Sequence, residues 1–253
     1  SDTTDFDFWH YLFAEVNMYQ YNHTRPTPHL LFDIAKGNAY NASSVNIFGF
    51  NRDVATDYET IWNDGGGYVY PTAALTMSVS SDSAFDTMPV LISGLDINYN
   101  PIATTVTLNG TTPVIAGVNF FRINSAVILA GSNVGNISIS NGGVKYGFIE
   151  AGLGITQACV YTVPAGHCLY LFRIDANSAT TNGQKYLFIR NKVTTNGRTL
   201  RVSEATFSTS QVSYDRQVPF KITEKSDFQF EAKSSSSINE IAIFIEAVLV
   251  KDE

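Results

Sequence analysis

Charged side chains are scarce in this chain. Asp, Glu, Lys and Arg make up 15% of its 253 residues, against about 25% in a typical globular domain. Ser, Thr, Asn and Gly take their place. The 16 Lys and Arg residues are scattered, and the formal net charge is −7. Since no basic stripe could follow a phosphate backbone, we expect no nucleic-acid partner.

Long apolar runs and targeting signals are missing as well. No stretch reaches the roughly 18 apolar residues of a membrane-spanning helix, so we expect no membrane partner. The opening residues Ser1–Asp7 are acidic and lack the basic start of a secretory signal. These two absences predict a soluble protein made in a cytoplasm.

The chain has only two cysteines, Cys159 and Cys168. They flank a predicted turn at Val163-Pro164-Ala165-Gly166, and a disulfide between them would need a favourable strand register. The alternative is a pair of small reduced core residues, which we favour. So few cysteines in so long a chain exclude a disulfide framework.

Motifs that hold phosphates, metals or cofactors are also absent. Gly65-Gly66-Gly67 lacks the Lys and Ser/Thr of a phosphate loop, which favours a flexible turn. The four histidines, His10, His23, His29 and His167, show no metal-ligand spacing. We therefore expect no cofactor and no metal site.

Four acidic residues lie close together in the sequence: Asp53, Asp57, Glu59 and Asp64. They could bind Ca²⁺ through their oxygens, or two could serve as the acid and nucleophile of a glycosidase. Because the spacing matches no calcium loop, we favour solvated loop acids. No catalytic residue can be assigned, and we expect no enzyme activity.

Aromatic residues are abundant, and they concentrate near the N-terminus. Phe, Tyr and Trp make up 13% of the chain. Either a short helix capped by Asp5 or an extended arm accounts for the segment Phe6–Tyr21. As an arm it would dock on a neighbouring subunit; otherwise it covers its own core. The candidate interaction residues are Phe6, Phe8, Trp9, Tyr11, Phe13, Tyr19 and Tyr21.

From Ser44 onward the apolar residues follow a period of two. Leu75, Met77 and Val79 alternate with polar residues, as in a half-buried strand. Hairpin-type turns are predicted at Asn109-Gly110, Asn141-Gly142-Gly143, Asn182-Gly183 and Asn196-Gly197. The stretch Ile241–Val250 is apolar on both faces except for Glu246, which predicts a central, fully covered strand.

About a dozen predicted strands at roughly 8–12-residue spacing indicate an all-β fold. The sequence predicts a jelly-roll-like β-sandwich over residues 41–253, which could comprise two packed sub-domains. Residues 1–40 form a separate aromatic-rich N-terminal arm in this interpretation.

Five segments carry a resemblance to a known family: SSVNIFGFNRDV (Ser43–Val54), ETIWNDGGGYVYP (Glu59–Pro71), MPVLISGLDINYNPIATTVTLNGTTPV (Met88–Val114), FFRINSAVILAGSNVGNISIS (Phe120–Ser140) and YTVPAGHCLYLFRIDA (Tyr161–Ala176). Together they resemble virion structural proteins of tailed phages of marine and aquatic bacteria. About half of the chain shares in this resemblance. It implies a β-rich particle protein of the head-decoration or fibre kind, with no activity and no cofactor.

The leading hypothesis is therefore a non-enzymatic capsid decoration or cement protein of a virion. It would be made in the host cytoplasm, form a homo-oligomer, most simply a trimer, and bind the major capsid protein or other virion subunits. The alternative is a tail-fibre, spike or head-fibre component that binds a host receptor or glycan. In that alternative, exposed Trp62, Tyr68 and Tyr70 could stack on sugar rings, although core packing is the favoured interpretation of these three.

Overall fold

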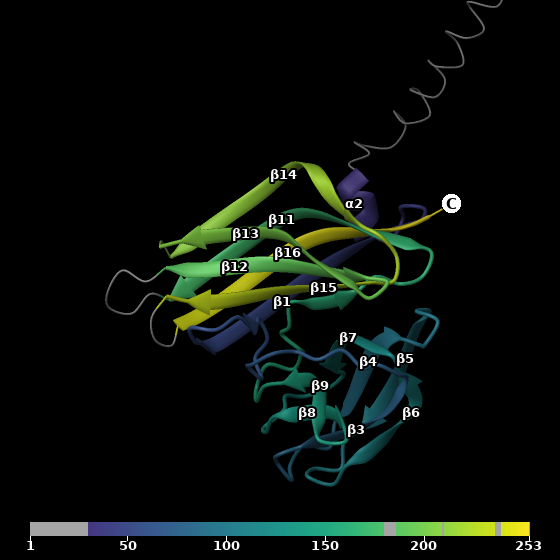
Figure 1. Ribbon diagram of the computed structural model, residues 1–253. Helices are drawn as coiled ribbons and strands as arrows, with labels where there is room; N and C mark the ends of the chain where they lie inside the picture. Colours follow the sequence, from purple (N-terminus) through teal and green to yellow (C-terminus); the bar gives the residue numbers. More distant parts are fainter. Residues whose placement is uncertain (1–29, 180–185, 209, 236–238, 253) are drawn as a thin grey trace, which may run out of the picture. The chain divides into compact units, whose positions relative to one another are not determined.

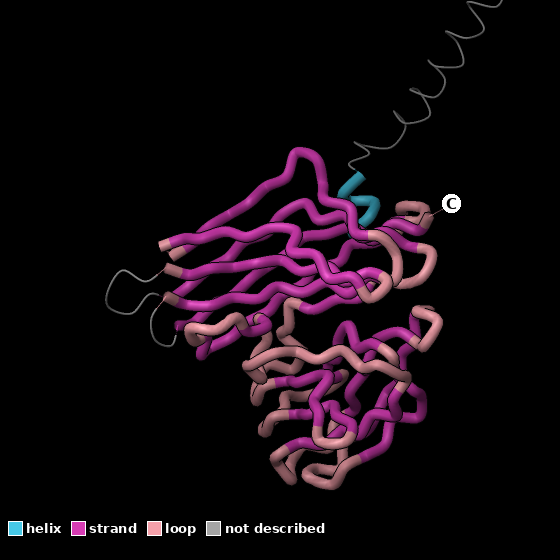
Figure 2. Tube along the Cα trace, in the orientation of Figure 1, coloured by secondary structure: helices cyan, strands magenta, loops and turns pink. Residues whose placement is uncertain are grey.

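β-strands account for nearly all of the regular structure in the described chain. The computed structural model describes residues 30–179, 186–208, 210–235 and 239–252. A single short helix, α2 (Leu30–Ala35), stands at the start of these ranges. Figures 1 and 2 show that strands and the loops between them make up the rest. The predicted all-β class is confirmed.

Two antiparallel sheets form the larger sandwich. One sheet has the order β1 (Ala42–Val54), β16 (Asn239–Lys251), β11 (His167–Ala179), β14 (Gln211–Ile222). The other has the order β10 (Val160–Thr162), β15 (Ser226–Ser234), β12 (Leu187–Thr195), β13 (Arg198–Phe207), and the short β2 (Glu59–Thr60) also pairs with β15.

The strand pairs of this sandwich are nested in the sequence. The innermost pair is the hairpin β12–β13, and around it lie the pairs β11–β14, β10–β15 and β1–β16. The connections between consecutive strands of the sandwich cross from one sheet to the other, except in the β12–β13 hairpin and between β2 and β10, which both pair with β15. The chain therefore resembles one long hairpin of paired strands that is wrapped around the core.

Apolar side chains from both sheets fill the space between them. Leu169 and Ile243 contribute from one sheet, and Phe228 and Leu187 contribute from the other. The β12 burial pattern alternates strictly along its first seven residues, as expected for a strand with one face on a core. This core confirms the predicted β-sandwich.

A second sandwich with its own core is built by residues between β2 and β10. Its four-stranded sheet has the order β6 (Val114–Phe120), β3 (Leu75–Ser81), β8 (Ile137–Asn141), β9 (Val144–Ile149). Its three-stranded sheet has the order β5 (Pro101–Thr107), β4 (Pro89–Leu95), β7 (Arg122–Ile128). Met77 and Val79 are fully buried in its core, which confirms the alternation predicted for that strand.

The chain enters and leaves this second sandwich at adjacent points. Trp62 follows β2, and Ala158 precedes β10, and the two residues form an isolated antiparallel bridge. β2 and β10 both pair with β15, so they act as two parts of one interrupted strand. The second sandwich is therefore an insertion into one strand of the first, and we call it the insert (residues 63–157).

The hairpin predictions meet three different outcomes. Asn141-Gly142-Gly143 joins β8 to β9, and Asn196-Gly197 joins β12 to β13, so both of these predictions are confirmed. Asn182-Gly183 lies outside the described residues. At Asn109-Gly110 the predicted turn forms and is closed by an antiparallel bridge between Asn109 and Thr112, but the flanking strands β5 and β6 belong to different sheets and do not pair.

The turn at Gly110 instead ties the chain to another loop. Gly110 donates its N–H to the carbonyl of Asp86 and accepts the N–H of Ser81. Its φ of 56° is the left-handed conformation that makes Asn-Gly a turn signal. The local conformation was therefore predictable, whereas the pairing of the flanking strands was not.

The predicted central strand near the C-terminus is confirmed in position. β16 lies between β1 and β11. Full coverage of the strand was predicted wrongly: one face carries buried Ile241, Ile243 and Ile245, whereas the other face is partly exposed because only one side of this sheet packs on the core.

Candidate functional site

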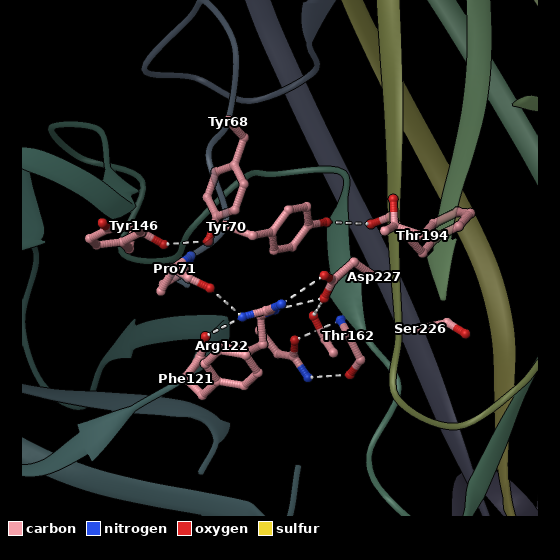
Figure 3. A network of polar contacts seen from close by, with 12 residues as sticks. Tyr68, Tyr70, Pro71, Phe121, Arg122, Tyr146, Thr162, Thr194, Ser226 and Asp227 are labelled. Carbon is pink, nitrogen blue, oxygen red and sulfur yellow. Dashed lines mark hydrogen bonds and ion pairs between the residues drawn. The ribbon is translucent and has the colours of Figure 1, made fainter. Parts of the chain in front are cut away.

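A buried ion pair joins the insert to the first sandwich. Arg122 begins β7 in the insert, and Asp227 lies on β15. Arg122 Nε donates to Asp227 Oδ1 at 2.7 Å, and Nη2 donates to Oδ2 at 2.8 Å. Nη1 donates to the carbonyls of Pro71 and Phe121, each at 2.8 Å. Figure 3 shows the guanidinium pointing between Pro71 and Asp227.

Further hydrogen bonds hold the acidic partner in place. Thr162 Oγ1 donates to Asp227 Oδ1 at 2.7 Å. Asn124 exchanges two hydrogen bonds with the backbone of Thr162, each at 2.9 Å. β7 of the insert and β10 of the first sandwich are thereby connected next to the ion pair.

Aromatic rings enclose the guanidinium. The Arg122 Cζ atom lies 3.9 Å from the centroid of the Phe121 ring, 5.1 Å from that of Tyr70 and 5.8 Å from that of Tyr99. Tyr70 donates its hydroxyl to the carbonyl of Phe228 at 3.0 Å. We call this group of ion pair, hydrogen bonds and rings the Arg122–Asp227 joint.

Burial controls the ionisation of the joint's tyrosines. Burial raises the pKa of Tyr70 well above its ordinary value, and the nearby charge of Asp227 raises it further. Burial likewise raises the pKa of Tyr68, whose hydroxyl donates to the Tyr146 carbonyl at 3.1 Å. Both phenols remain protonated at neutral pH and act as hydrogen-bond donors.

The arginine stays charged despite its burial. Removal from water lowers the pKa of Arg122, but the hydrogen bonds and the charge of Asp227 outweigh that effect, and the pKa ends above its ordinary value. Both Asp227 oxygens are occupied, and Arg122 makes four hydrogen bonds. Because its hydrogen-bonding groups are so fully used within the protein, the joint fixes the geometry of the strands that it connects.

The acidic residues singled out in the sequence do not converge on one site. Glu59 accepts hydrogen bonds from Asn51 and Gly66, and Asp64 pairs with Lys145 of the insert. Asp53 and Asp57 are exposed. Over the ranges that the structure describes, no three His, Cys, Asp or Glu side chains form a group that could hold a metal ion.

The remaining candidate residues take structural positions. Trp62 and Tyr68 are buried, and their rings meet edge to face with centroids 5.2 Å apart, which confirms core packing for these two. The two cysteines are free and buried, which confirms the reduced alternative. Gly65 and Gly66 have φ values of 74° and 70°, as the predicted turn requires.

The histidine and arm predictions fall on different parts of the chain. His167 begins β11 and is partly buried, with its Nδ1 2.8 Å from the carbonyl of Ala165. His10, His23 and His29 lie outside the described residues. So do all seven candidate interaction residues: Phe6, Phe8, Trp9, Tyr11, Phe13, Tyr19 and Tyr21.

Sequence reasoning missed the Arg122–Asp227 joint. Its two charged members are 105 positions apart. The segment Asp227–Ala232 alternates polar and apolar residues, a pattern typical of a strand with one solvent-exposed face. In the structure, however, β15 is buried on both faces. No sequence signal distinguished a solvated polar face from one covered by an insertion.

The chain shows only weak similarity to known proteins. No protein-family model matches the chain, and no curated protein matches it. A solved structure of infectious bursal disease virus, Gt strain, is similar over 89% of this chain and 83% of that chain, with 9% identity and a TM-score of 0.20. T=1 particles derived from infectious bursal virus give 84% and 75% coverage, 9% identity and a TM-score of 0.17. At such TM-scores the likeness supports no conclusion about fold or function.

Proposed function

We propose that this chain is a non-enzymatic structural protein of a virion. The observation that carries the proposal is the nested strand order of the larger sandwich. Four strand pairs lie around one core, in sheets β1-β16-β11-β14 and β10-β15-β12-β13, and this order favours a jelly roll made of two Greek keys. Jelly rolls build viral capsid domains, although lectins and cupins use them too.

Three further features favour a particle subunit over the other users of this fold. The described residues offer no metal-binding group. The buried Arg122–Asp227 joint connects the insert to the first sandwich. The sequence is poor in charge and resembles virion proteins of tailed phages. Fold alone does not imply function, so the proposal rests on these features together.

The more specific role that we propose is capsid decoration. The chain would form a homo-oligomer, most simply a trimer, on the major capsid protein of a phage head. Edge strands that are left unpaired in a single subunit favour assembly that covers them.

Light scattering on the purified full-length chain tests the oligomeric part. We expect a mass about three times 27.7 kDa. A monomer at every accessible concentration would contradict the trimer.

Co-sedimentation with phage heads made without this protein tests the virion part. We expect saturable binding of the full-length chain to the heads. A chain lacking residues 1–29 retains every described strand and should bind less, because the aromatic segment is the predicted docking element. Absence of the chain from purified virions and from reconstituted heads would overturn the proposal.

A further inference from the structure

The first sandwich contains an apolar pocket at one side, between its two sheets. β13 and β14 stand at the ends of their sheets' strand orders, and the pocket opens between them. Its volume is about 170 Å³. Buried Ile174, Ile189 and Phe230 belong to both its lining and the core, while exposed Ala205 and Tyr214 line it from the edge strands. Figure 1 shows β13 and β14 on the same side of the sandwich.

The size and lining of this pocket suit one aromatic ring. An apolar cavity of about 150 Å³ holds one benzene molecule. A ring that entered between β13 and β14 would contact the side chains of both sheets and cover their exposed edges. Phe and Tyr provide such rings with little loss of conformational entropy.

The pocket is also lined by an arginine, Arg216, whose Nε lacks a hydrogen-bond acceptor among the described residues. The Arg216 Nε atom is buried. Its Cζ lies 5.1 Å from the centroid of the Tyr214 ring and 5.3 Å from that of Phe220. Glu204, the acidic residue of the lining, is already paired with Arg201 at 2.9 Å. The pocket therefore favours an occupant with an aromatic ring and a carboxylate.

The N-terminal segment of this chain has that chemistry. Residues 1–24 contain the aromatic stretch Phe6–Tyr21 and four acidic residues, Asp2, Asp5, Asp7 and Glu15, and no Lys or Arg. The 29 residues that precede the described chain could span at most about 100 Å if fully extended. That length reaches well beyond one subunit of this size.

We infer that the pocket between β13 and β14 receives an aromatic side chain from the N-terminal segment of a second copy. The segment's carboxylates lie against Arg216, and its ring fills the space above Phe230. This inference rests on the proposed function, because a virion subunit must make contacts between copies, and an occupant from the same chain would make none.

Photo-crosslinking of the full-length chain identifies the occupant. A benzophenone amino acid replaces Ala205, and isotopically heavy and light chains are unfolded, mixed and refolded together before irradiation. We expect cross-linked peptides that join position 205 to residues 1–24 and combine one heavy and one light chain. The same amino acid at Thr206, which is exposed on β13 and does not line the pocket, is the matched control.

Each outcome of that experiment decides the inference. Cross-links between heavy and light chains at position 205 and few at 206 support it. Cross-links only within chains of one isotope would show that the chain fills its own pocket, and equal yields at both positions, or none, would show no specific docking. Either result overturns the inference.

Two substitutions give an independent measurement. Ala205→Trp fills the pocket mouth and should raise the concentration at which the oligomer dissociates about tenfold or more, as loss of a central contact does. Thr206→Trp should leave it unchanged. Arg216→Gln should weaken association and reduce its sensitivity to salt. Circular dichroism checks that each variant folds. If the folded Ala205→Trp variant dissociates at the same concentration as the unchanged chain, the pocket does not hold a second copy's segment and the inference is refuted.

Failure of this inference is separable from failure of the virion role. If Ala205→Trp binds phage heads as well as the unchanged chain does, the pocket is dispensable and the decoration role stands. If the unchanged chain does not bind heads but gives the cross-links at position 205, self-association stands and the decoration role fails.

Discussion

Arg122 and Asp227 illustrate what a single pair of residues contributes to this protein. Their side chains are 7% and 9% exposed, so neither charge is well solvated. Such a pair adds little net stability over an apolar replacement, yet loss of one partner leaves an uncompensated buried charge. The joint therefore specifies how the two strands β7 and β15 meet.

Asp227→Asn should destabilise the protein by about 3–5 kcal/mol, because the Arg122 charge would remain buried without its counter-ion. Urea unfolding measures the change. Asp215→Asn is the control, since Asp215 pairs with Arg173 on the surface with its side chain 74% exposed, and its loss should cost less than about 1 kcal/mol. Equal losses for the two variants would show that the joint is not the anchor described.

The buried carboxyl of Asp86 should make the stability of the protein depend on pH. Burial raises the pKa of this carboxyl, but hydrogen bonds from Ser81, Val134 and Gly135 together lower it below its ordinary value. The unfolded chain therefore binds a proton more readily than the folded chain does. The resulting stability is present above the unfolded pKa and is lost as the pH falls through the folded pKa.

We expect the free energy of unfolding to fall as the pH drops below about 4. Asp86→Asn should flatten that part of the profile, because it removes the carboxyl whose pKa is lowered in the folded chain. Urea titrations at several pH values provide the measurement. A profile for Asp86→Asn parallel to that of the unchanged chain would contradict the assignment.

Individual strands show where sequence patterns succeed and where they stop. The hairpins β8–β9 and β12–β13 were predictable because Asn-Gly and Gly-Gly turns impose the pairing of adjacent strands. Asn109-Gly110 produced the predicted turn and a single Asn109–Thr112 bridge but no pairing of β5 with β6, since Gly110 bonds to Asp86 and the chain passes on to another sheet. The local turn conformation could be predicted from the sequence. The sheet that each following strand joins could not, because it depends on contacts with residues far away in the chain.

β4 carries a close approach that only glycine permits. The β4–β7 register shifts between Ser93 and Gly94, and a Cβ at Gly94 would lie 2.0 Å from the Arg122 carbonyl oxygen. Gly94→Ala must therefore push β7 away and disturb the joint. We expect a loss of about 1–3 kcal/mol or more in urea unfolding.

Gly117→Ala is the matched control for this strand variant, because a Cβ there meets no atom within 4 Å. Gly94→Ala and Asp227→Asn should also be non-additive, since both act on Arg122. Additive losses would mean that the clash at Gly94 is relieved without moving Arg122.

At the scale of the whole molecule, the insert is a self-contained addition to the first sandwich. Its ends meet at the Trp62–Ala158 bridge, and its core contains none of the residues of the first core. The sequence indicated that two sub-domains were possible but not that one interrupts a strand of the other. That arrangement is specified by contacts such as Arg122–Asp227, which no local pattern encodes.

Replacement of residues 64–156 by a short Gly/Ser linker should leave the first sandwich folded. The face of β15 that would be uncovered carries polar Asp227, Gln229 and Glu231, which water can solvate. Calorimetry should show one cooperative transition at a lower temperature than in the full chain. A far-ultraviolet spectrum without β structure, or no cooperative transition, would show that the first sandwich depends on the insert to fold.

The position of β16 has a consequence for the order of events during synthesis. This strand lies between β1 and β11 but is the last of the described strands to leave the ribosome. Until β16 is made, the sheet lacks this inner strand, and the backbone N–H and C=O groups with which β1 pairs to β16 have no partner strand. The insert has all of its strands long before that point and can fold first. Before β16 is made, the nascent chain therefore exposes strand edges of β1 and β11 that the folded sheet covers.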